Sequence, residues 1–121
     1  MYLRKTVTVT TNADGDGTGY TPVVSGRISQ IRYVKTDFAN GVDFTITLEA
    51  TGETVWAEEN VNASATRAPR QPTHSTAGVA ALYAAAGQAV NAPIVAVRDR
   101  VKIVVAAGGA TTTGTFHVVL E

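Results

Sequence analysis

The feature that most constrains the fold is a period of two in the apolar residues. From Val42 to Ala50 every second residue is apolar, and the residues between them are Asp, Thr or Glu. Similar alternation occurs over residues 2–11, 101–106 and 114–121. Successive side chains of a β-strand point to opposite faces, so this pattern is typical of strands with one buried face.

Shorter strand candidates lie between these segments, at Tyr20–Val24, Ile28–Lys35, Glu53–Ala57 and Ile94–Val97. About seven or eight short strands separated by Gly, Asn and Asp turns predict an all-β protein. We therefore expect an antiparallel β-sandwich, jelly-roll-like or of a related Greek-key type, with at most one short helix. The helix candidate is the alanine-rich stretch Thr76–Val90, for which an irregular loop is the alternative.

The chain length fits a single domain, so we expect residues 1–121 to form one β-sandwich domain. The segment Glu59–Gly78 follows neither the strand period nor the helix period, and it contains Pro69 and Pro72. Connections of this length are uncommon inside a domain unless they are mobile or functional. We expect residues 59–78 to be a long irregular arm or loop that contacts a partner.

The candidate contact residues follow from this expectation. Arg and His side chains can donate hydrogen bonds to a partner, and proline limits the entropy lost when an arm becomes ordered. The only tryptophan is predicted to be a core or interface residue, with a sugar-stacking platform as the alternative. The interaction candidates are Arg67, Arg70, Pro72, His74 and Trp56.

Charge is balanced overall but unevenly distributed along the chain. Residues 1–35 carry five basic and two acidic residues, residues 36–59 carry six acidic residues and no basic ones, and the remainder again carries five basic against two acidic. Ordinary solvated charge is one interpretation, and complementary patches that orient copies or a shared partner are the other. A net charge of zero argues against nucleic acid as a partner, and no apolar run is long enough for a membrane span.

Catalytic and metal chemistry find little support in the residues. His74 and His117 are the only histidines, and no hydroxyl has a base and an orienting acid at a recognisable spacing. Asn12, Asp14 and Asp16 match the first positions of a calcium loop, but Val23 stands where its bidentate Glu is needed. We therefore predict a plain hairpin loop here, no enzyme activity, no metal and no cofactor.

Three segments, Lys5–Val34, Ala68–His74 and Arg98–Glu121, together cover over half of the chain. They resemble a family of small proteins encoded among the head genes of tailed bacteriophages. The resemblance implies a capsid cement or decoration protein, a β-sandwich located on the outer surface of the virion capsid. Such a structural protein binds as a homo-oligomer, a dimer or trimer, and bridges neighbouring major capsid proteins.

Two other functions are compatible with the same residues. A carbohydrate-binding module would use Trp56, Tyr20, Tyr33 or Tyr83 as stacking platforms. A tail or collar subunit of a phage would share the fold and differ in its location in the virion.

Overall fold

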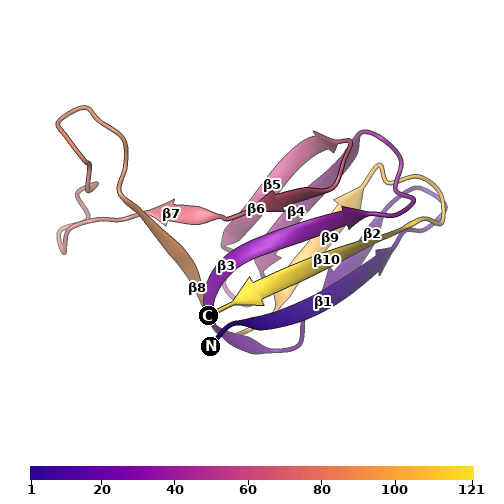
Figure 1. The fold of residues 1–121 in the computed structure, drawn as a ribbon, viewed down its shortest axis with the longest axis horizontal. Coiled ribbons are helices and arrows are strands. Elements are labelled where there is room, and N and C mark those ends of the chain that lie inside the picture. Colours follow the sequence, from indigo (N-terminus) through magenta and orange to yellow (C-terminus); the bar gives the residue numbers. More distant parts are fainter.

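The computed structural model describes every residue from Met1 to Glu121 and contains ten β-strands and no helix. All strand pairs are antiparallel, and the strands form two sheets that face each other (Figure 1). The prediction of an all-β antiparallel sandwich is thus confirmed. The jelly-roll description is finer than this and stays a prediction.

The first sheet has the order β1 (Leu3–Thr10), β10 (Thr113–Leu120), β3 (Val24–Lys35), β8 (Asn91–Asp99) and β7 (Arg70–Pro72), and β6 (Ala65–Arg67) pairs with β3 beside β8. The second sheet has the order β2 (Gly17–Tyr20), β9 (Val101–Ala106), β4 (Val42–Leu48) and β5 (Thr54–Val61). The chain changes sheet at most of its connections, so neither sheet is built from one continuous part of the sequence.

The period of two in the sequence determines which residues of each strand form the core. The apolar residues of β4, β9 and β10 that recur at every second position are buried between the sheets. The 22 buried apolar residues form one cluster to which both sheets contribute. Burial of apolar surface is the main favourable term in folding, so the two sheets stabilise each other through this cluster.

Aromatic rings join the sheets at the centre of the core. Phe44 of β4 lies 4.6 Å from Tyr33 of β3 and 4.9 Å from Phe116 of β10, measured between ring centroids. Trp56 of β5 packs edge-on to Phe44 at 5.6 Å, and Phe38 stacks on Tyr33 at 6.1 Å. These edge-to-face and offset geometries are those that aromatic pairs prefer.

The Tyr33 hydroxyl is the one buried side-chain polar atom without a hydrogen-bond partner in the protein. Burial raises the pKa of Tyr33, and the negative charge of Asp37 raises it further. The phenol therefore stays neutral and acts in the core mainly through its ring.

The predicted strand boundaries are wrong at the start of β3. Tyr20–Val24 is not one strand, because β2 ends at Tyr20 and β3 begins only at Val24. Pro22 lies in the connection between them, where its lack of an N–H costs no ladder hydrogen bond. Residues 25–27, which lie between the two predicted strands Tyr20–Val24 and Ile28–Lys35, instead belong to β3, whose pairing with β8 is irregular between Val24 and Gly26.

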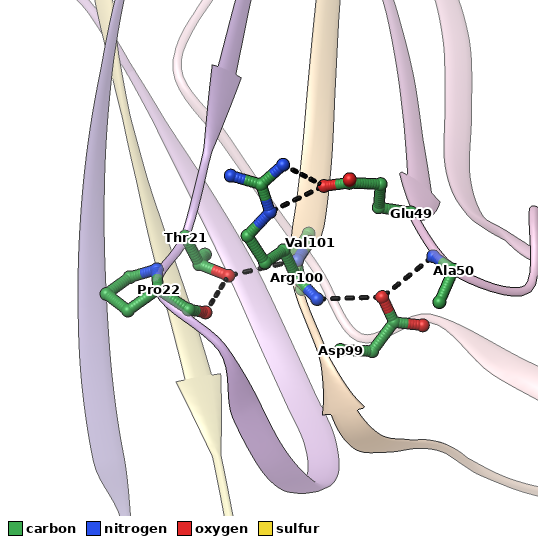
Figure 2. A network of polar contacts seen from close by, with 7 residues as sticks. All are labelled: Thr21, Pro22, Glu49, Ala50, Asp99, Arg100 and Val101. Atoms are coloured by element: carbon green, nitrogen blue, oxygen red, sulfur yellow. Dashed lines mark hydrogen bonds and ion pairs between the residues drawn. The ribbon is translucent and has the colours of Figure 1, made fainter.

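A polar network ties the sandwich together where β8 passes into β9 (Figure 2). Asp99 is buried, and its Oδ1 accepts hydrogen bonds from the N–H groups of Ala50 and Arg100, both at 2.8 Å. Thr21 Oγ1 accepts from the N–H of Val101 at 2.9 Å. Arg100 forms an ion pair with Glu49, so the ends of β2, β4 and β8 meet at this corner.

Replacing Asp99 should test how far the fold depends on this corner. Asp99→Ala leaves two backbone N–H groups without their acceptor, so the free energy of unfolding should fall by about 1–3 kcal/mol. Asp99→Asn keeps an oxygen acceptor in the same place and should cost less. Urea unfolding of both variants measures the difference, and equal losses would show that the side-chain acceptor is unimportant.

Candidate interaction surfaces

The segment Glu59–Gly78 is not one irregular stretch, which corrects the prediction. Its first residues complete β5, and it then contains β6, which pairs with β3, and β7, which pairs with β8. β6 and β7 are each three residues long. Strands this short do not repeat the period of two often enough for it to be recognised in the sequence.

An arm does leave the sandwich, but it begins later in the chain than predicted. β8 pairs with β3 from Ile94 onward, whereas its residues 91–93 pair with β7. β7 and this part of β8 form a two-stranded ribbon that projects from the sandwich and carries the connection between them (Figure 1). We call residues 70–93 the arm and residues 73–90 its tip.

Backbone hydrogen bonds give the tip a defined shape. Thr73, Ala81 and Val90 form three such bonds among themselves, with N···O distances of 2.8 and 2.9 Å. Two turns extend from this centre, closed by bonds from Ser75 to Val79 and from Tyr83 to Gln88. The helix considered for residues 76–90 is absent, and the loop alternative describes this segment.

The arm has no buried residue, although its tip carries large apolar side chains. Val79, Leu82 and Tyr83 are 65%, 43% and 76% exposed. From Gln71 to Val97 the sequence contains no Asp, Glu, Lys or Arg. This uncharged stretch is visible in the sequence, but the prediction weighed Thr76–Val90 only as a helix or a loop.

Three of the predicted contact residues lie on the arm. Arg70 is at its base, where Nη1 donates to the carbonyl oxygens of Ser29 at 3.1 Å and Pro69 at 2.8 Å. Pro72 ends β7, and His74 is exposed at the start of the tip. The structure thus brings Arg70, Pro72 and His74 together along one ribbon.

The other two, Trp56 and Arg67, lie on the sandwich. Both Glu58 carboxylate oxygens accept from Arg67, at 2.8 and 3.0 Å, and Trp56 Nε1 donates to Glu58 at 3.0 Å. The Arg67 guanidinium also lies over the Trp56 ring, 5.8 Å from its centroid. Trp56 is buried, which confirms a core position for it.

This cluster shifts the ionisation of its members. The hydrogen bond from Arg67 lowers the pKa of Glu58, the Trp56 indole lowers it further, and burial partly opposes both. The Glu58 carboxylate in turn raises the pKa of Arg67. The Arg67 guanidinium is therefore already engaged by Glu58 of the same chain in the absence of a partner.

The outer face of the first sheet carries basic residues. Alternation along β1 and β3 turns Arg4, Arg27 and Arg32 away from the core, and none of them is in an ion pair. Arg32 donates to Thr66 on the neighbouring strand at 3.0 Å. Glu121 pairs with Arg27 through two backbone hydrogen bonds of 2.8 and 2.9 Å.

The acidic segment of the sequence belongs mainly to the second sheet. Residues 36–59 include all of β4 and most of β5. Glu49 and Glu58 are paired with Arg100 and Arg67, while Glu59 is exposed and has no ion pair. The two halves of the sandwich therefore differ in charge, as an oriented interaction would require.

The four proposed sugar-stacking residues are not equivalent. Tyr33 and Trp56 are buried in the core and cannot stack on a ligand. The Tyr20 ring is covered by the Arg100 guanidinium, whose Cζ lies 4.1 Å from the ring centroid. Of the four, only Tyr83 presents a freely exposed ring, so the structure does not gather an aromatic platform.

The remaining polar candidates are separated. His117 Nδ1 and Thr6 Oγ1 form a hydrogen bond of 3.0 Å on the outer face of the first sheet. His74 lies on the tip, so the two histidines are in different parts of the fold. Asn12 Oδ1 accepts from the N–H groups of Asp14 at 2.9 Å and Asp16 at 3.1 Å, which closes the hairpin loop on itself. No group of three His, Cys, Asp or Glu side chains is arranged to hold a metal ion.

Comparison with known proteins gave no relatives from which to transfer a function. No protein-family model matches the chain, and a search of curated proteins found no significant match. The structure also contains no helix able to cross a membrane.

The Glu58–Arg67 pair should make stability depend on pH. The native pKa of Glu58 lies below its unfolded value, so the pair stabilises the fold above about pH 4.3 and is lost as the pH falls through the lower native pKa. Urea unfolding of the wild type and Glu58→Gln should differ at pH 7, and the difference should shrink as the pH falls below about 4.3 and through the lower native pKa. The control Glu59→Gln removes an unpaired carboxylate, and a difference as large as that of Glu58→Gln would contradict the assignment.

Proposed function

We propose that this chain is a structural virion protein of a tailed bacteriophage. In this proposal it is a capsid cement or decoration protein that binds the outer surface of the head as a homo-oligomer and bridges neighbouring major capsid proteins. The observation that carries the proposal is the arm, which extends from a well-packed sandwich and exposes an uncharged apolar tip. A surface of this kind is typical of protein interaction sites.

The architecture suits a mechanical role. Packaged DNA pushes outward on the shell, and a clamp that contacts two capsid subunits resists this pressure by binding alone. Each contact can be modest, because a bivalent clamp gains from effective concentration. The unpaired basic residues Arg4, Arg27 and Arg32 on one outer face supply an oriented electrostatic contact for such a clamp.

The jelly-roll description belongs to the same proposal. Successive strands alternate between the sheets from β1 to β4 and again from β8 to β10. This alternation is what two interleaved Greek keys produce, and the jelly roll is a common architecture of viral structural proteins.

The location of the protein in the virion tests the proposal directly. Cryo-electron microscopy of virions should show the sandwich on the outside of the head, between neighbouring major capsid proteins. Virions that lack the protein should release their DNA at a lower temperature than the wild type. Density on the tail or collar instead would overturn the cement assignment and identify a different virion part.

The contact residues can be tested on isolated heads. Arg67→Ala combined with Arg70→Ala should lower the occupancy of the protein on heads, measured by co-sedimentation. Glu58→Gln is the matched control, because it breaks the same ion pair and leaves both guanidinium groups in place. Unchanged occupancy of the double variant, or an equal loss in the control, would show that these arginines do not contact the head.

A further inference from the structure

The composition of the tip differs from that of an ordinary solvent-exposed surface. Its apolar residues Val79, Leu82 and Tyr83 are exposed, and no charged side chain lies beside them in the sequence from Gln71 to Val97. The same uncharged stretch continues along β8 onto the sandwich, where Val95 and Val97 are also exposed. Exposed apolar residues therefore occur both on the tip and on β8 beyond the base of the arm.

The tip is also organised before binding. Its backbone is held by hydrogen bonds centred on Thr73, Ala81 and Val90, and the Thr73 hydroxyl donates to the Val90 carbonyl at 2.7 Å. An ordered segment loses less conformational entropy on association than a disordered one. The tip thus presents its apolar side chains on an ordered backbone, which a partner can contact without first ordering the chain.

The charge pattern favours a second copy of the chain as the partner. In an assembly with rotational symmetry, residues near the axis face their own copies, so any charge there meets an identical charge and is repelled. A long stretch without Asp, Glu, Lys or Arg avoids this repulsion. The rest of the protein is charged in the ordinary way, and the uncharged stretch begins immediately after Arg70 and ends immediately before Arg98.

We infer that the tip is the self-association surface of this protein, and that its occupant is the tip of a second copy of the same chain. The arms of neighbouring copies meet at a rotation axis through Val79, Leu82 and Tyr83, and the sandwiches stand around that axis. The basic outer face of the first sheet then stays available for a different partner. This inference rests on the homo-oligomer of the proposed function and assigns its contact surface, but it is independent of the location in the virion and can be tested on the purified protein.

Sedimentation velocity measures the effect of the tip residues on the oligomer. The wild type should sediment as an oligomer at micromolar concentration, and Leu82→Asp combined with Tyr83→Asp should sediment as a 12.6 kDa monomer. Thr8→Asp combined with Thr45→Asp is the control, because it adds the same charges at exposed positions of the two sandwich faces. A monomeric wild type, or a tip variant that remains oligomeric, would overturn the inference.

Cross-linking places the contact independently of variant stability. The chain has no cysteine, so a single introduced thiol gives an unambiguous signal. Ala84→Cys, next to Tyr83 on the tip, should form a disulfide-linked dimer on mild oxidation, at least ten times more than Thr45→Cys on the sandwich. Equal cross-linking of the two variants would show that the tips do not meet. Unfolding curves like that of the wild type confirm that both variants are folded.

Discussion

The contact of Phe44 with Tyr33 and Phe116 is the interaction on which the two sheets depend. The three rings come from strands in different parts of the chain, and they pack at centroid distances of 4.6 to 5.2 Å. Because β3 and β10 belong to one sheet and β4 to the other, this packing fixes the sheets face to face. The corner at Asp99 and the arm lie at opposite ends of β8, which belongs to the sandwich that these rings stabilise.

Sequence patterns predicted the parts of the fold that repeat. The alternation in Val42–Ala50 is long enough to indicate a strand with one buried face, and the structure places β4 there. The pairing order could not be predicted, since alternation says which face is buried and nothing about the neighbouring strand. β6 and β7 escaped prediction because three residues contain a single repeat of the period.

The candidate contact residues show a second limit of prediction from the sequence. Arg67 and Arg70 are close in the sequence, but the structure places Arg67 in an ion pair on the sandwich and Arg70 at the base of the arm. Proximity along the chain could not reveal this division, because the ribbon begins between them. The apolar tip could have been predicted from the absence of charge between Gln71 and Val97, which is visible in the sequence without any structure.

The attachment of the arm determines which strand carries a force that is applied to the tip. Both of its ends are attached to β3: the segment before it pairs through β6 with residues 31–33, and β8 pairs with the start of β3. A pull on the tip is therefore divided between two stretches of one central strand. That strand is also bonded to β10 along its other edge, so tension enters the sandwich at its middle rather than peeling off an outer strand.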